Sequence, residues 1–92
     1  MATYYTNDDG FIYKKEDDKV SILSWRELEF NDAYDLYDKE EIEDPKLNKL
    51  FGIDELFDLS NCRIISKQEV KKKIENHMIE TAINGTKLIE SL

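Results

Sequence analysis

The first quarter of the chain alternates hydrophobic and polar side chains in three short segments with polar turns between them. The segments cover residues 2–6, 11–15 and 20–25, and the turns cover 7–10 and 16–19. In the third segment Val20 and Ile22 fall on one face of a strand, and Leu23 and Trp25 fall on the other. An Asp-Gly pair closes the first turn and suits the positive φ of a tight hairpin. The pattern predicts an N-terminal antiparallel meander.

The hydrophobic spacing changes to a helical period after residue 24. Ser24-Trp25-Arg26-Glu27 has the S-x-x-E form of a capping box, which predicts a helix across residues 27–39. The apolar residues that follow the helical period there are Phe30, Ala33, Tyr34 and Tyr37. Several like charges within one or two turns oppose this helix.

A second helix start lies at Asp44-Pro45, where a capping acid precedes a proline at the first helical position. The apolar face of this helix carries Leu47, Leu50 and Phe51. Gly52 is expected to end the helix, because glycine adopts the left-handed conformation of many helix ends. Asp54 is then expected to cap one or two further turns.

The C-terminal third predicts one strand and one long helix. The elements expected in order are a strand at 62–65, a helix at 67–83 with its C-cap at Asn84-Gly85, and a last helical turn at 87–92. Ser66 and Glu69 form a capping box, and Ile65 and Val70 have the spacing of a hydrophobic staple around it. Together these elements predict one α+β domain over residues 1–92. In it a small antiparallel sheet packs against the C-terminal helix and the shorter helices.

The formal net charge is −8, and its distribution is uneven along the chain. Residues 27–44 contain nine acidic side chains and a single base, Lys39, so this segment alone carries −8. The rest of the chain is neutral, and from Leu59 onward six bases outnumber four acids. Such a field repels nucleic-acid phosphates from the acidic side of the molecule and attracts basic surfaces.

The sequence offers little support for an enzyme, a metal site or a membrane span. Residues 7–16 match part of the calcium-loop pattern, but Tyr5 stands where the first carboxylate ligand is needed. Cys62 and His77 fall on different expected elements, and one Cys with one His is too few for zinc. The basic run Lys71-Lys72-Lys73 is typical of a solvated helix face, and a second interpretation is that it neutralises the acidic segment within the fold or across a dimer. We therefore expect no catalysis, no cofactor and no metal.

Cysteine usage and hydropathy indicate a compartment. Cys62 is the only cysteine, so no intramolecular disulfide can form, which fits a reducing environment. The first residues lack the basic and apolar regions of a secretory signal, and no stretch approaches about 20 apolar residues. We expect a cytoplasmic protein, a monomer or small homo-oligomer, that does not bind membranes or nucleic acid directly.

The acidic segment carries the first functional hypothesis. Its carboxylates, with neighbouring tyrosines, would bind a protein that has a basic surface, such as a nucleic-acid enzyme, and would block its nucleic-acid site. The residues expected at this interface are Asp32, Tyr34, Asp35, Tyr37, Asp38, Glu40, Glu41, Glu43 and Asp44. In size and acidity the chain resembles phage anti-defence proteins as a class, including anti-CRISPR inhibitors and DNA mimics. The competing interpretation is a solvated acidic face that keeps the protein soluble.

A second hypothesis uses the aromatic side chains of the N-terminal sheet. Tyrosine serves equally in cores and at interfaces, because its ring buries area while its hydroxyl remains hydrated. The side chains concerned are Tyr4, Tyr5, Phe11 and Tyr13. In this case the chain would be an immunity-type or adaptor protein that binds a toxin or enzyme through the sheet.

Overall fold

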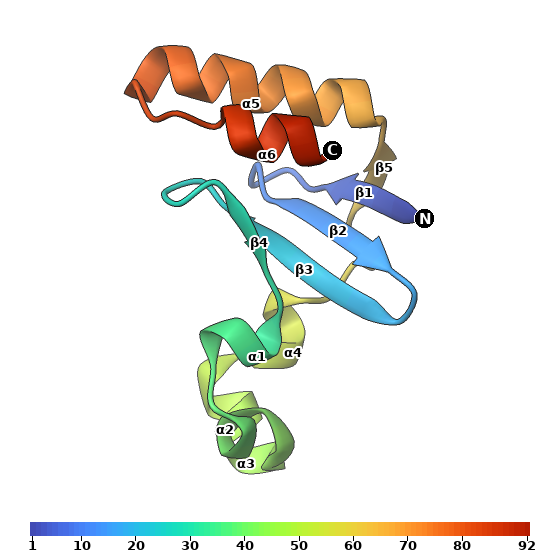
Figure 1. Cartoon of the computed structure of the whole chain (residues 1–92). Coiled ribbons are helices and arrows are strands. Elements are labelled where there is room, and N and C mark those ends of the chain that lie inside the picture. The colour runs from blue at the N-terminus through green and yellow to red at the C-terminus, as the bar shows by residue number, and fades with distance from the viewer.

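A computed structural model describes all 92 residues and has an α+β architecture, as the sequence predicts (Figure 1). The strands are β1 (Ala2–Thr6), β2 (Ile12–Glu16), β3 (Lys19–Ser24), β4 (Glu29–Asn31) and β5 (Arg63–Ile65). The helices are α1 (Ala33–Leu36), α2 (Lys39–Glu43), α3 (Pro45–Phe51), α4 (Ile53–Leu56), α5 (Lys67–Thr81) and α6 (Thr86–Ser91). The strands form one antiparallel sheet in the order β4-β3-β2-β1-β5. No helix combines the length and the apolar character that crossing a bilayer requires.

The predicted N-terminal meander is confirmed, and local side chains explain its turns. The Asn7 side-chain oxygen accepts hydrogen bonds from the backbone N–H groups of Asp9 and Phe11, both at 3.1 Å. Gly10 has φ +85°, a conformation that glycine adopts without a steric penalty. At the next turn Asp17 takes φ +56°, which aspartate tolerates better than most residues. These turns place β1, β2 and β3 side by side in sequence order.

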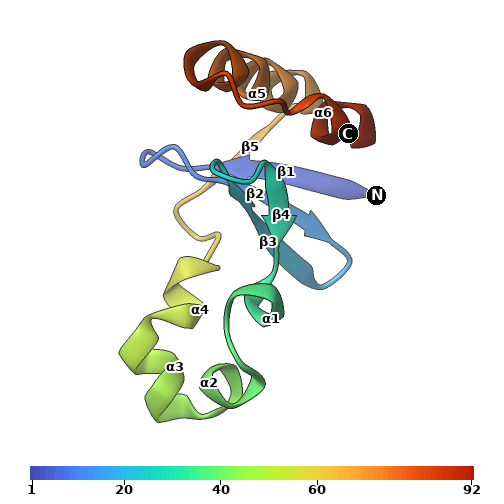
Figure 2. The same cartoon turned by 60° about the vertical axis from the view of Figure 1, so that its left-hand side comes forward.

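Helices α5 and α6 cover one face of the sheet (Figures 1 and 2). The main hydrophobic core lies there and comprises Tyr4, Ile12, Leu23, Ile65, Val70 and Ile74. Tyr4 and Ile65 are partners across β1 and β5, so the predicted strand at 62–65 is confirmed and brings α5 onto the sheet. The Ser66 hydroxyl accepts a 3.1 Å hydrogen bond from the Glu69 N–H, which starts α5 as predicted.

The opposite face of the sheet packs on α4 through a smaller cluster. Tyr13 and Ile22 pair across β2 and β3, and both side chains are buried, as is Ile53 at the start of α4. The Tyr13 hydroxyl donates a 2.8 Å hydrogen bond to the Leu56 carbonyl. Burial, and secondarily the nearby Cys62 and acidic groups, raise the pKa of Tyr13 above its usual 10.0. This contact ties the helices between β4 and β5 to the sheet.

The predicted helix over 27–39 is wrong, because its first part forms strand β4 instead. The Ser24 hydroxyl does accept a hydrogen bond from the Glu27 N–H at 3.2 Å, but Leu28 then takes φ +53° and turns the chain back. Phe30 pairs with Leu23 across the sheet, and its ring lies 6.0 Å from that of Tyr4. The strand satisfies backbone groups and buries an aromatic ring, whereas a helix here would concentrate acidic side chains.

Two further helix boundaries differ from the prediction. Helix α5 ends at Thr81, before a left-handed Ala82 (φ +58°), and not at Asn84-Gly85. Gly85 serves close packing instead, since a Cβ there would lie 2.8 Å from the Leu28 side chain. Asp44 caps α3 and a left-handed Gly52 (φ +63°) ends it, as predicted. Helix α4, however, begins at Ile53, so Asp54 is not its cap.

Residues 32–58, which we call the helical arm, project from the sheet at the end opposite α5 (Figures 1 and 2). The molecule is accordingly elongated, with extents of 40 × 24 × 24 Å. The arm contains ten acidic and three basic side chains, a net charge of −7. Because Lys71-Lys72-Lys73 lies on α5, this basic run is at the far end and does not neutralise the arm.

Candidate functional site

Three aspartates spaced six residues apart begin the first three helices of the arm. Asp32 precedes α1, Asp38 precedes α2 and Asp44 precedes α3. The Asp32 carboxylate accepts a 2.9 Å hydrogen bond from the Asp35 N–H, and the Asp44 carboxylate accepts one of the same length from the Lys46 N–H. Helix N-termini favour carboxylates because their N–H groups are unpaired and the helix dipole is positive there. Part of the acidic run therefore has a role in folding.

Two further carboxylates bond back to the residue that precedes a helix. The Asp35 carboxylate accepts a 2.8 Å hydrogen bond from the Asp32 N–H. The Glu41 carboxylate accepts a 2.9 Å hydrogen bond from the Asp38 N–H. An acid three residues after an aspartate is the sequence signal for this arrangement, and hydrophobic periodicity does not reveal it.

Asp32 is buried, unlike the other acidic residues predicted for the partner surface. Its side chain is 10% exposed and forms a 2.7 Å ion pair with Lys19 of β3. The Lys19 hydrogen bond holds the pKa of Asp32 below its usual 3.8, outweighing the effect of burial, and the pKa of Lys19 is raised in turn. The Asp32 carboxylate thus joins the arm to the sheet and is already neutralised within the fold.

The other predicted residues present unpaired charge at the surface of the arm. Asp35, Asp38, Glu40 and Glu43 are exposed, and Glu41 and Asp44 are half-exposed. The two ion pairs of the structure are Lys14–Glu16 and Lys19–Asp32, so none of these six carboxylates has a basic partner. The arm therefore offers its charge to solvent or to another molecule.

Exposed hydrophobic side chains lie among these carboxylates. The residues are Tyr34 (61% exposed), Leu36 (46%), Leu50 (75%) and Phe51 (47%). The predicted apolar face of α3 is thus only partly buried, because Leu47 is half-buried while Leu50 and Phe51 face outward. Tyr37, also half-buried, has its ring 6.5 Å from the Phe51 ring. Periodicity placed Leu50 and Phe51 on one apolar face of the helix, and the structure leaves both side chains exposed.

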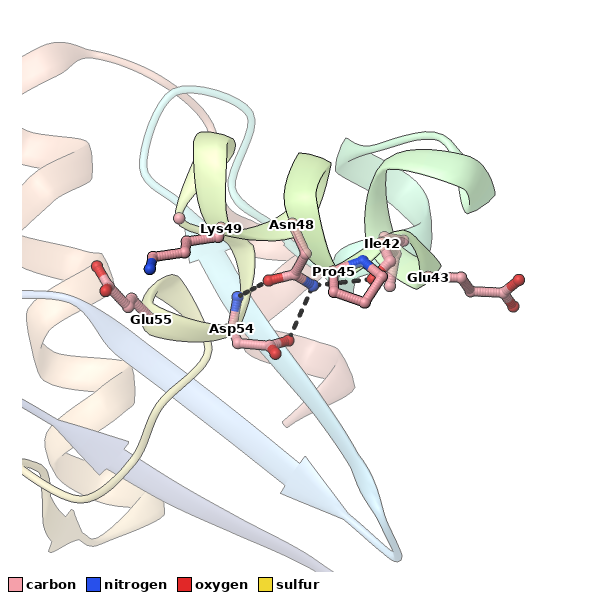
Figure 3. A pocket seen from close by; sticks show the side chains of 8 residues that line it. Ile42, Glu43, Pro45, Asn48, Lys49, Asp54 and Glu55 are labelled. Carbon is pink, nitrogen blue, oxygen red and sulfur yellow. Dashed lines mark hydrogen bonds between the residues drawn. The ribbon is translucent and has the colours of Figure 1, made fainter.

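The buried Asn48 side chain fixes the shape of the arm (Figure 3). Its amide nitrogen donates to the Ile42 carbonyl at 2.9 Å and to the Asp54 carboxylate at 3.1 Å. Its amide oxygen accepts from the Asp54 N–H at 3.2 Å. These three bonds link α2, α3 and α4 beside a polar cavity of about 350 Å³. The surface carboxylates consequently project from a defined scaffold.

The N-terminal aromatic residues divide between core and surface. Tyr4 and Tyr13 are 5% and 2% exposed and belong to the packing on the two faces of the sheet. Tyr5 is half-buried, and Phe11 is 37% exposed. An aromatic sheet surface would therefore have to rely on Tyr5 and Phe11, without Tyr4 and Tyr13.

Cys62 and His77 have separate environments. The His77 Nε2 lies 2.7 Å from the Trp25 carbonyl oxygen, and its ring is 4.9 Å from the Trp25 ring. Cys62 is half-buried, and burial, with a smaller effect of Asp58, raises the pKa of its thiol. A raised thiol pKa lowers the fraction of reactive thiolate at neutral pH. No group of three or more His, Cys, Asp or Glu side chains is arranged to hold a metal ion.

Comparisons of the chain with protein-family models, with curated proteins and with solved structures find no match. The feature of this chain that bears most directly on function is the surface chemistry of the arm.

Proposed function

We propose that this chain is a non-enzymatic inhibitor or regulator whose helical arm binds a basic, nucleic-acid-handling protein at its nucleic-acid site. One observation carries the proposal: the arm presents unpaired carboxylates together with exposed hydrophobic side chains on one scaffold. Small acidic inhibitors of this kind, anti-CRISPR proteins and DNA mimics among them, form the functional class that fits this surface.

The two kinds of side chain have different tasks in such a complex. The carboxylates take the place of phosphates on the basic surface and accelerate association, an effect that salt screens beyond about 8–10 Å. The hydrophobic groups supply contact area that is shielded from water once the complex forms, and aromatic anchors often dominate binding energy. Leu50 and Phe51 of α3 and Tyr34 of α1 are the candidate anchors.

The hydrophobic exposure favours this proposal over a face that serves solubility alone. A solubility face gains from charged side chains and loses from exposed Leu and Phe. The arm has charged and hydrophobic side chains in close succession along the chain, as at the exposed residues Tyr34-Asp35-Leu36 of α1. A binding surface accounts for both features, since charge directs the encounter and apolar contacts hold the complex.

The second candidate function is a protein contact through the sheet. Tyr5 and Ile64 are partners across β1 and β5; Tyr5 is half-buried and Ile64 is 67% exposed. Replacing both residues by Ser tests this alternative. Loss of partner binding in that variant, with the arm intact, would identify an adaptor or immunity-type protein.

The experiment compares two triple variants that change the net charge equally. The arm variant carries Asp38→Asn, Glu40→Gln and Glu43→Gln, which leaves the carboxylates of Asp32, Asp35, Glu41 and Asp44 in their backbone bonds. The control carries Glu75→Gln, Glu80→Gln and Glu90→Gln, which are exposed on α5 and α6. Each tagged protein captures partners from host lysate at moderate salt, and the captured partner is then tested for nucleic-acid binding.

The proposal expects wild type and control to retain a nucleic-acid-binding protein that the arm variant loses. It also expects wild type to displace nucleic acid from that partner, with an affinity that falls as salt increases. Equal retention by the arm variant and the control would refute the proposal. A partner that does not handle nucleic acid would refute the inhibitor mechanism.

A further inference from the structure

A cavity of about 600 Å³ opens where the arm meets the sheet. It lies between the β2–β3 turn, the start of β3 and helices α1, α2 and α4. The volume is in the range of sites that bury a small ligand or a few side chains of a peptide.

Six of the eleven residues that line this cavity are hydrophobic, and the other five are charged. Ile53 is 1% exposed, and Val20, Ile42 and Phe57 are half-buried, which makes a hydrophobic floor. Tyr34 also lines the cavity and is 61% exposed, so it remains accessible to a bound molecule. The exposed acids that line the cavity are Asp17, Asp18 and Asp54.

We infer that the cavity receives a basic peptide segment of the partner protein, an inference that rests on the proposed function. A bulky apolar side chain of that segment fills the floor, and adjacent arginines bond the carboxylates of Asp17 and Asp18. The cavity thereby becomes the specificity-determining part of the interface. The remainder of the arm surface supplies charge and hydrophobic contact area without selecting a sequence.

Charge complementarity selects this occupant. Four aspartates and one lysine line the cavity, and Lys19 is already paired with Asp32 at 2.7 Å. An acidic segment would meet uncompensated carboxylates, and a purely apolar one would leave them without a partner. Arginine fits both parts of the site, because its planar guanidinium binds carboxylates in a bidentate manner and stacks on aromatic rings such as that of Tyr34.

Three capped tripeptides test the inference directly on the whole chain by NMR titration. Acetyl-Arg-Trp-Arg-amide carries both features, acetyl-Arg-Gly-Arg-amide carries only charge, and acetyl-Gly-Trp-Gly-amide carries only the apolar group. The first peptide is expected to give saturable shifts at the backbone amides of Val20, Ala33 and Ile53. The other two are expected to bind at least about fivefold more weakly, since each lacks one of the two contacts.

Two double variants of equal charge change identify where the peptide binds. Asp17→Asn with Asp18→Asn removes two carboxylates from the cavity and keeps a residue that tolerates φ +56° at position 17. Glu40→Gln with Glu43→Gln removes two carboxylates outside it. The first variant is expected to weaken acetyl-Arg-Trp-Arg-amide about fivefold, and the second less than twofold.

The inference would be overturned if the charge-only peptide bound as tightly as acetyl-Arg-Trp-Arg-amide, or if the two double variants weakened peptide binding equally. Either result would leave only a diffuse electrostatic attraction between the peptide and the protein. Absence of saturable shifts in the cavity would overturn the inference as well. The proposed function is tested separately. A partner that is lost by the arm triple variant but retained by Asp17→Asn with Asp18→Asn supports the function and rejects the cavity as its recognition site. Peptide binding in the cavity, without displacement of nucleic acid from a captured partner, supports the cavity as a binding site and rejects the proposed function.

Discussion

Replacement of Asp32 tests whether this residue stabilises the fold, in contrast to the exposed carboxylates of the arm. Asp32→Ala removes the acceptor for the Asp35 N–H and the partner of Lys19. Asp32→Asn keeps a side-chain oxygen for the Asp35 N–H and removes only the charge. The Lys19 side chain is 69% exposed, so water screens the ion pair and the cap is the larger contribution.

The loss of the N-cap sets the size of the expected decrease in unfolding free energy. Loss of an aspartate N-cap costs about 0.5–2 kcal/mol, and the Ala variant also loses the ion pair, so we expect destabilisation of about 1–2 kcal/mol. For a chain of this size that corresponds to a fall in Tm of roughly 5–15 °C. The Asn variant is expected to lose less than half as much. Urea denaturation followed by circular dichroism measures both.

Acid titration adds a second measurement on the same residue. Because the pKa of Asp32 is lowered from 3.8, its charge contributes stability above pH 3.8, and this contribution is lost as the pH falls through the lowered pKa. The difference in unfolding free energy between wild type and Asp32→Asn should therefore shrink in acid.

Equal destabilisation by Asn and Ala would refute the cap as the main contribution. Partner binding gives the functional contrast. Asp32→Asn should weaken partner binding much less than the arm triple variant does, since the carboxylate is buried and paired. A loss of binding comparable to that of the arm triple variant would return Asp32 to the interface.

Three further predictions concern the scaffold. Asn48→Ala should cost about 1–3 kcal/mol and speed amide exchange in the arm while α5 stays protected, because three hydrogen bonds are lost; uniform exchange changes would contradict this. Ala82→Gly should raise stability by about 0.5–1 kcal/mol in thermal denaturation, since residue 82 has φ +58°, and a lower Tm would contradict it. The raised pKa of Tyr13 means that its contribution is complete below pH 10.0 and lost as the pH rises through the folded value. Tyr13→Phe should cost about 1 kcal/mol at pH 7 and weaken the alkaline loss, and an unchanged alkaline profile would argue against the Leu56 contact.

The sequence predicted the negative charge of the candidate site, but not the contacts that its side chains make or which of them are exposed. The acidic run between residues 27 and 44 is visible in the sequence, and the structure exposes most of it. The sequence pattern did not reveal that Asp32 pairs with Lys19, because that contact joins two segments that approach each other only in the folded chain. The pattern also did not reveal that Leu50 and Phe51 are exposed, since periodicity identifies an apolar stripe but does not show what covers it.

The sequence by itself determined the elements whose signals lie within a few residues of one another. The hairpin at Gly10, the start of α3 at Asp44 and the start of α5 at Ser66 each depend on a local hydrogen bond or backbone preference. Tertiary structure alone decided the fate of residues 27–31. The local capping signal at Ser24 favours a helix, yet strand β4 forms because the edge of β3 and the ring of Tyr4 offer Phe30 a ladder and a packing partner. The same long-range packing sets the arm against the sheet and creates the cavity between them, since no local signal specifies which distant surfaces will meet.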